Sequence, residues 1–180
     1  MNKNSFAVLG VGNILEKDDG IAVYAANFLE SNYHFTPDID IINGGVEGIN
    51  LLNLLMQYDP ILILDTVDLD DAAGSIYHIP ASELTGYGLN SAGAHEIGVI
   101  QCLDMMELMD KKLPKSSVLG IVPDEICIDI GLSETLHVKF DEYIKAVLFI
   151  LGNEGIKAEK AEKQLSLEAI IENFKNGGRD

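Results

Sequence analysis

The sequence predicts an α/β fold with a largely parallel sheet. Short apolar runs alternate with longer amphipathic segments along the chain, which is the pattern of strands joined by helices. With 180 residues, 47% of them hydrophobic, the chain is of the right size for one domain with a substantial buried core. Alternating strands and helices of this kind place helices against a mainly parallel sheet.

The first half of the chain supplies three predicted strands. The apolar run 6–9 is the first, and the segment 20–32 after it repeats apolar residues at helical spacing. A second strand at 39–42 precedes a helix at about 47–58. The run 61–64 is continuously apolar, as expected of a strand that is buried on both faces.

The second half continues the alternation. Residues 75–79 alternate as a strand does, and the segment 81–94 is the longest loop, which we expect to cover the functional site. A helix from 95 to about 110, a fifth strand at 117–122 and a long helix at 133–151 follow. A serine at the first position of that helix is a favoured N-cap, and a glycine just after its last position suits its end.

The C-terminal segment differs in composition from the rest. We assign residues 1–155 to a single α/β domain and residues 156–180 to a C-terminal extension rich in Lys, Glu and Ala. Within the extension, apolar residues recur at helical spacing and predict a short amphipathic helix: Leu167, Ile170, Ile171 and Phe174. We expect this helix to pack on the domain, with a partner-binding or frayed tail as the alternative.

Composition excludes several classes of protein. The 12 basic against 29 acidic residues give a net charge of −17 without any basic stripe, so we expect no nucleic-acid partner, although a basic peptide would be attracted. No apolar run approaches the roughly 18 residues that a membrane span needs, so we expect no membrane insertion. Cys102 and Cys127 form no CxxC pair, and no signal-peptide pattern is present, which predicts a cytoplasmic protein.

Three side chains of metal-binding type follow predicted strands. Asp19 comes after the first strand, Asp65 ends the third, and His95 closes the long loop. Because the carboxyl ends of parallel strands share one edge of a sheet, the three side chains can meet there. Two carboxylates and an imidazole suit zinc or nickel better than copper(I), and leave positions for water or a substrate group.

Each of these residues also has a simpler structural interpretation. Asp18 and Asp19 stand where acidic groups favour the start of a helix, and Asp18 is better explained as a solvated or capping acid than as a fourth ligand. Asp65 can cap the segment after its strand, and His95 can be an ordinary surface histidine. Residue spacing alone leaves both interpretations open.

Two glycine-containing turns bear on the kind of ligand. The turn 10–12 suggests a dinucleotide-binding fingerprint, but position 15 is Leu and two acids stand where a pyrophosphate would bind, so we exclude that function. The segment 43–48 can host an extended peptide or permit a tight strand-to-helix turn, and the turn is the simpler interpretation. No Gly-x-Ser-x-Gly elbow is present, so a hydrolase of this sequence must activate water with a metal or with carboxylates.

The chain resembles the nickel–iron hydrogenase maturation endopeptidases over about residues 6–150. Five blocks carry this resemblance in order: Leu9–Leu15 with Asp18-Asp19-Gly20, Gly44-Gly45-x-x-Gly48, Leu64-Asp65, His95-Glu96-x-Gly98 and Val118–Pro123. The opening block together with the ordered Asp65 and His95 is specific, whereas any one block alone is not.

The resemblance implies a three-layer α/β/α sandwich with a five-stranded, mostly parallel sheet. It also implies an endopeptidase that removes a C-terminal extension from the precursor of the hydrogenase large subunit after nickel insertion. In that role Asp19, Asp65 and His95 contact the nickel, which is carried by the substrate, and zinc or another divalent metal can substitute for it. Two ways of activating water remain open, namely metal-assisted attack and general-base catalysis by the carboxylate of Asp19 or Asp65. We expect the glycine loop of Gly44, Gly45 and Gly48 to bind substrate. We expect a monomer.

Three positions depart from the family pattern. Ala22 and Gly93 replace a glycine and a hydroxyl residue, and Asn43 replaces an aspartate, which removes a carboxylate beside the double glycine. Two other functions therefore remain open, namely a spore-protein endopeptidase of related fold that needs no nickel, and a non-catalytic, metal-dependent binding module.

Overall fold

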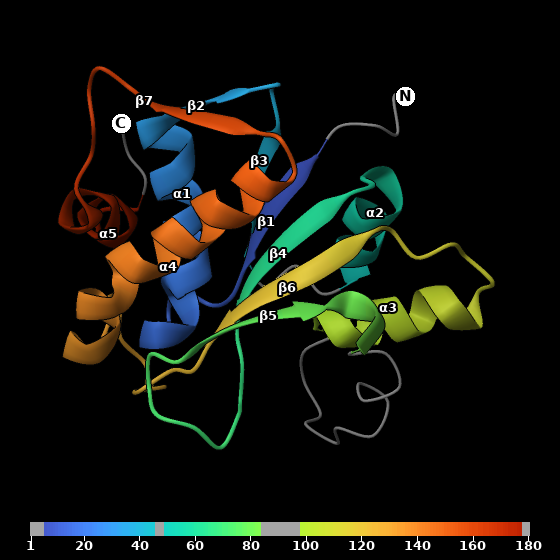
Figure 1. Cartoon of the computed structure of the whole chain (residues 1–180). Helices are drawn as coiled ribbons and strands as arrows, with labels where there is room; N and C mark the ends of the chain where they lie inside the picture. The colour runs from blue at the N-terminus through green and yellow to red at the C-terminus, as the bar shows by residue number, and fades with distance from the viewer. Residues whose placement is uncertain (1–5, 46–48, 84–97, 178–180) are drawn as a thin grey trace.

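The computed structural model describes residues 6–45, 49–83 and 98–177, without the side chains of residues 49 and 50. A five-stranded sheet with the order β3-β1-β4-β6-β5 forms its centre (Figure 1). All neighbouring strands are parallel except β5 and β6, so the predicted mostly parallel sheet is confirmed. Its strands are β1 (Ala7–Val11), β3 (Asp40–Gly45), β4 (Ile61–Thr66), β5 (Ile76–Pro80) and β6 (Ser116–Ile121).

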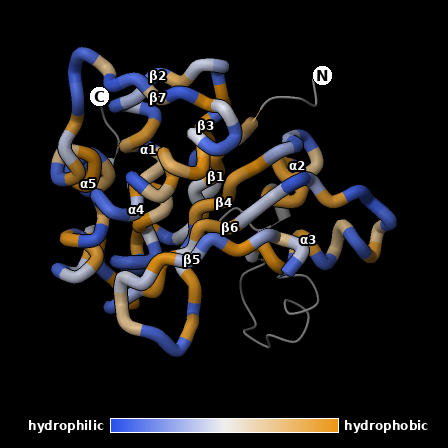
Figure 2. The backbone as a smooth tube through the Cα atoms, viewed as in Figure 1, coloured by the Kyte–Doolittle hydropathy of each residue, from blue (hydrophilic) through white to orange (hydrophobic). Residues whose placement is uncertain are grey.

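Helices cover both faces of the sheet and complete the predicted three layers. One face packs against α1 (Ile21–Asn32), α4 (Glu134–Asn153) and α5 (Leu167–Lys175). The other packs against α2 (Ile49–Gln57) and α3 (Val99–Leu108), as Figure 1 shows. Hydrophobic residues are accordingly concentrated along the central strands in Figure 2.

The central strands are buried on both faces because each face carries a helical layer. All five residues of β1 are buried, and so are the first four of β4. Alternate side chains of each strand enter the two separate cores, for example Leu62 on the α1 side and Ile63 on the α2 side. This double burial explains why the two strands appear in the sequence as uninterrupted apolar runs.

A second, two-stranded sheet was not predicted. It pairs β2 (Tyr33–Thr36) with β7 (Lys157–Lys160) in antiparallel register. Strand β2 follows α1 without any turn residue between them, and β7 is a fully exposed Lys-Ala-Glu-Lys segment with low intrinsic strand propensity. Pairing between these distant segments, rather than local preference, produces both strands.

The C-terminal extension packs on the domain, as expected. Leu167, Ile170 and Ile171 of α5 are buried in the same core as α1 and α4. The Phe174 ring meets the Tyr24 ring of α1 edge to face, with their centroids 5.5 Å apart. The boundary between residues 155 and 156 stays a prediction.

The remaining elements agree with the prediction to within a few residues. Two 3-10 turns, η1 (Lys17–Gly20) and η2 (Ala81–Glu83), precede α1 and follow β5. Ser133 caps α4 because its side chain accepts a hydrogen bond from the backbone N–H of Leu136. Most of the predicted loop 81–94 lies outside the described residues. Within the described ranges, no helix is both long and apolar enough to cross a membrane.

Candidate active site

Two of the predicted site residues meet at the carboxyl ends of adjacent strands. Asp65 is the penultimate residue of β4, and Asp19 lies in η1, the turn that follows β1. The two strands are parallel neighbours, so their carboxyl ends lie side by side, which is where open α/β sheets bind ligands. Both aspartates are partly buried. The structure thus brings the Asp19 and Asp65 side chains close together, and their meeting with His95 stays a prediction.

Thr66 connects the two carboxylates. Its backbone N–H donates to Asp65 Oδ1 at 2.8 Å, and its hydroxyl donates to Asp19 Oδ1 at 2.7 Å. The other oxygen of Asp19 accepts a hydrogen bond of 2.6 Å from the backbone N–H of Asn13. Both carboxylates are thus oriented by fixed donors. A carboxylate oxygen that accepts one hydrogen bond keeps a second lone pair, which can bind a cation or a water molecule.

The electrostatics of the pair favour keeping one proton. Burial and the neighbouring Asp19 carboxylate raise the pKa of Asp65 from 3.8 to about 8, against the opposing effect of its hydrogen bond from the Thr66 N–H. A carboxyl group with a pKa near neutrality can give and take a proton at physiological pH, as a general acid or base must. The same repulsion would be relieved by a cation placed between the two groups.

The turn after β1 holds Asp19 in place through a close backbone approach. Gly12 has a φ of +144°, and a Cβ atom at this position would lie 1.9 Å from the carbonyl oxygen of Asp19. Only glycine fits both the conformation and the contact. This geometry makes the glycine turn a support for the backbone of Asp19.

Asp18 has a different role from the one predicted. It is fully buried rather than solvated, and it does not cap its own helix. Its two oxygens accept hydrogen bonds from three backbone N–H groups of the segment that leads into α4. The donors are Asp124 at 3.0 Å, Glu125 at 2.8 Å and Ser133 at 2.6 Å. Asp18 therefore ties η1 to the start of α4, a role that spacing could not show because the donors lie more than a hundred residues away.

The predicted glycine loop begins at the same edge of the sheet. Gly44 and Gly45 end β3, and the backbone N–H of Gly12 donates to the carbonyl of Gly45 at 3.1 Å. Asn43 accepts a hydrogen bond from the N–H of Gly45 at 3.2 Å, so the amide that replaces the family's usual aspartate stabilises the turn. Gly48 lies outside the described residues.

The third predicted ligand is not described. His95 and Gly93 belong to residues 84–97, so their placement relative to the aspartates stays a prediction. Within the described part of the chain, no group of three or more His, Cys, Asp or Glu side chains is arranged to hold a metal ion. The described donor set is the Asp19 and Asp65 pair, to which His95 would add a nitrogen ligand.

Two further residues of the site were missed by sequence reasoning. Thr66 could have been suspected from its place directly after Asp65 at the strand end, but nothing local points to its contact with Asp19. Tyr143 of α4 is completely buried near Asp65, and burial together with the Asp65 charge raises the pKa of its hydroxyl well above 10. Its hydroxyl donates to the carbonyl of Leu119 at 2.8 Å, so it is a neutral, fixed group beneath the site.

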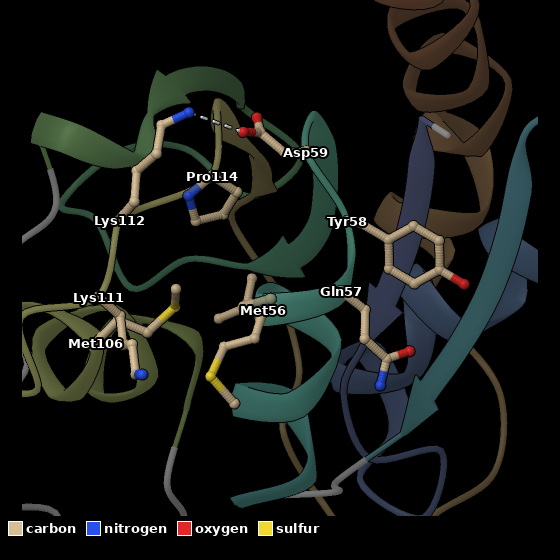
Figure 3. Close-up of a pocket in the computed structure, with 9 residues that line it drawn as sticks. Met56, Gln57, Tyr58, Asp59, Met106, Lys111, Lys112 and Pro114 are labelled. Carbon is tan, nitrogen blue, oxygen red and sulfur yellow. Dashed lines mark hydrogen bonds and ion pairs between the residues drawn. The ribbon is translucent and has the colours of Figure 1, made fainter. Parts of the chain in front are cut away.

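A separate pocket lies at the opposite edge of the sheet. Figure 3 shows Met56 beside Met106, with Pro114 beyond them and Lys112 paired with Asp59. The pocket is formed where β4 and β6 begin, since Asp59 and Pro114 precede these strands. It is therefore remote from Asp19 and Asp65, and we assign it no part in the chemistry of the site.

Comparison with known proteins finds relatives of one kind. The family model described as hydrogenase maturation protease (HycI) matches residues 23–150, which include Asp65 and His95 but begin after Asp19. The hydrogenase 2 maturation protease of Escherichia coli is 28% identical over 152 residues, covering 84% of this chain and 93% of that protein. The hydrogenase expression/formation protein HoxM of Azotobacter vinelandii is 25% identical over 161 residues, or 88% of this chain and 77% of its own length.

Solved structures give the same result. The hydrogenase maturating endopeptidase HybD from E. coli superposes with a TM-score of 0.77 and 28% identity, covering 87% of this chain and 97% of its own. A hydrogenase 2 maturation peptidase from a Thaumarchaeota archaeon superposes with a TM-score of 0.60 and 26% identity, covering 82% of this chain and 98% of its own. Together these matches extend over most of the sheet and both helical layers.

Proposed function

This chain belongs to the hydrogenase maturation protease family and is a peptide hydrolase, and on that premise we propose that it cleaves a C-terminal extension from the precursor of a nickel–iron hydrogenase large subunit. The observation that carries the proposal is the pair of carboxylates, Asp19 and Asp65, held together through Thr66 at the carboxyl edge of the sheet. Carboxylate pairs at such an edge can both recognise a divalent cation and move a proton.

Nickel enters this account as part of the substrate. Asp19 and Asp65 offer oxygen ligands, and His95 would offer a nitrogen, which is a donor set that nickel and zinc accept. A nickel ion already seated in the precursor would complete its coordination with these side chains and so bring the scissile peptide to the site. Cleavage then depends on a filled metal site, since the precursor is held at the two carboxylates through its nickel ion.

The aspartates also supply the proton transfers of hydrolysis. Water attacks the scissile carbonyl carbon and gives up a proton to a carboxylate, and the departing amide nitrogen receives a proton as the C–N bond breaks. Asp19 and Asp65 are the candidate bases.

The rest of the edge suits a peptide substrate. The backbone of Gly44 and Gly45 reaches the same edge as Asp19, and we propose that this loop, with Gly48, contacts the extended peptide. Both cysteines are free thiols, which supports action in a reducing compartment such as the cytoplasm. We further propose that the protease acts as a monomer.

The test is cleavage of a nickel-loaded precursor by the purified protein, followed by intact-mass spectrometry. The wild-type protein should release one fragment from the C-terminus of the large subunit. The Asp19→Asn variant should release it at least 100-fold more slowly, because the amide neither accepts a proton nor binds a cation as a carboxylate does. Asp38→Asn, which alters an exposed aspartate, is the matched control and should cleave normally. Intact nickel-loaded precursor after incubation with folded wild-type protein would overturn the proposal.

A further inference from the structure

Large apolar side chains are exposed beside the candidate active site. Leu15, Ile126 and Ile128 have 54%, 53% and 94% of their surface exposed, respectively. Leu15 and Ile128 line one open hollow together with Ile130, Asp129 and the Lys175 side chain of α5. Ile126 stands two residues before Ile128 on the same loop. Exposed apolar side chains that gather in this way can mark a contact with another molecule. We call Leu15, Ile126, Ile128 and Ile130 the rim patch.

The rim patch is held in a fixed relation to Asp19. The loop that carries its isoleucines pairs with the turn before Asp19 through two backbone hydrogen bonds, from Asp129 N–H to the Leu15 carbonyl at 3.0 Å and from Lys17 N–H to the Asp129 carbonyl at 2.8 Å. Asp18 also holds the start of the same loop, because its carboxylate accepts hydrogen bonds from the backbone N–H groups of Asp124 and Glu125. A molecule bound on the patch therefore lies next to the catalytic edge.

The charges around the patch favour a basic partner. Glu125 and Asp129 flank the segment Ile126-Cys127-Ile128. Of these two acids, only Glu125 forms an ion pair, with Lys17, in the part of the chain that the structure describes. The whole chain carries a charge of −17, so basic segments are attracted to it from a distance. Apolar side chains flanked by lysine or arginine would complement both the isoleucines and the surrounding acids.

We propose that the rim patch is the docking surface for the hydrogenase precursor, and that it binds a precursor segment of mixed apolar and basic side chains adjoining the scissile bond. The inference rests on the proposed function, because the occupant is chosen from continuity with the Asp19 and Asp65 edge. Docking here would hold the precursor by contacts that do not involve the reacting atoms. Its loss should therefore raise KM and leave kcat nearly unchanged.

The kinetic test compares two double variants that each replace exposed apolar residues. Ile126→Gln/Ile128→Gln removes the apolar part of the patch, and Leu108→Gln/Phe149→Gln alters side chains that are 73% and 71% exposed at the other edge of the sheet. We expect KM for nickel-loaded precursor to rise at least tenfold in the patch variant, with kcat within twofold, and no change in the control variant. Wild-type KM in the patch variant would overturn the docking surface while leaving the proposed function intact.

A second test uses Cys127, which lies between the two isoleucines. Cys127 is exposed and Cys102 is buried, so iodoacetamide should alkylate Cys127 selectively. Saturating precursor should slow this alkylation at least fivefold, and should not protect the cysteine of a Cys127→Ser/Phe149→Cys control.

This test separates failure of the inference from failure of the proposed function, because binding is measured without cleavage. Protection without cleavage would support the docking surface and overturn the proposed cleavage of this precursor. Equal alkylation rates with and without precursor would overturn the docking surface. Protection that instead grows with the concentration of the protease alone would overturn it in favour of a second copy of this chain.

Discussion

The Thr66 hydroxyl donates a hydrogen bond of 2.7 Å to Asp19 Oδ1, and this contact joins the end of β4 to η1, the turn that follows β1. The same residue donates its backbone N–H to Asp65, so one residue orients both carboxylates. Thr66 does not itself face a reacting atom in this account. It is a positioning residue, and its loss should misalign Asp19 rather than remove a chemical group.

Replacing Thr66 with Val should therefore lower kcat about tenfold, the equivalent of roughly 1.4 kcal/mol for one hydrogen bond to a charged group. Thr66→Ser keeps the hydroxyl and should restore most of the rate. KM for the precursor should change little in either variant. Steady-state kinetics with nickel-loaded precursor measures both effects, and equal rates for the Val and Ser variants would show that the hydroxyl does not position Asp19.

Replacing Asp18 with Ala should destabilise the fold by about 2–4 kcal/mol, because three backbone N–H groups would lose their charged acceptor in a buried place. The Asp68→Ala variant changes an exposed aspartate and serves as the control, with an expected effect within about 0.5 kcal/mol. Urea unfolding gives both values. A change of less than 1 kcal/mol for Asp18→Ala would contradict the structural role given to this residue.

The pH dependence of stability should report on Asp65. The pKa of Asp65 is about 8 in the folded state and 3.8 in the unfolded state, so the folded state holds this proton more tightly. The resulting contribution to the free energy of unfolding is complete below about pH 4 and is lost as the pH rises through 8. In metal-free protein, Asp65→Asn should lose less stability than wild type between pH 5 and pH 8, by on the order of 2 kcal/mol. Chemical unfolding at the two pH values checks this, with Asp68→Asn as the control, and parallel profiles for wild type and Asp65→Asn would refute it.

Replacing Gly12 with Ala should damage both the fold and the site. A Cβ atom there would collide with the Asp19 carbonyl oxygen, in a backbone conformation that alanine rarely adopts. We expect a loss of about 2 kcal/mol or more in stability, and a loss of cleavage even in molecules that fold. Gly152→Ala is the matched control, since its Cβ would enter open space within α4 and should stabilise slightly. Thermal unfolding and a cleavage assay on the soluble fraction measure the two effects.

Most of the fold could be predicted because its elements depend on local patterns. The runs in β1 and β4 are apolar throughout because helices cover both faces, and the spacing of Leu167, Ile170 and Ile171 in α5 follows from one buried stripe. Strand β7 could not be predicted in this way. Its Lys-Ala-Glu-Lys residues are exposed, and only pairing with β2 makes them a strand.

The candidate site was predictable to the extent that parallel strands end together. That rule predicts that the carboxylates of Asp19 and Asp65 lie near each other, and it leaves their chemical roles open. The partners of Asp18 could not be inferred, because a buried carboxylate is satisfied by whichever backbone N–H groups the tertiary fold delivers. The contact between Thr66 and Asp19 could not be inferred for the same reason, since the two residues lie 47 positions apart in the sequence.

Under the proposed function, Asp19 and Asp65 make cleavage conditional on nickel in the precursor. The most direct measurement is the cleavage rate of one purified precursor in nickel-loaded and nickel-free forms, followed by intact-mass spectrometry with the same preparation of protease. We predict release of the C-terminal fragment from the loaded form only, with the nickel-free form at least 100-fold slower. Equal rates for the two forms would contradict the claim and leave the carboxylate pair as a metal-independent hydrolytic site.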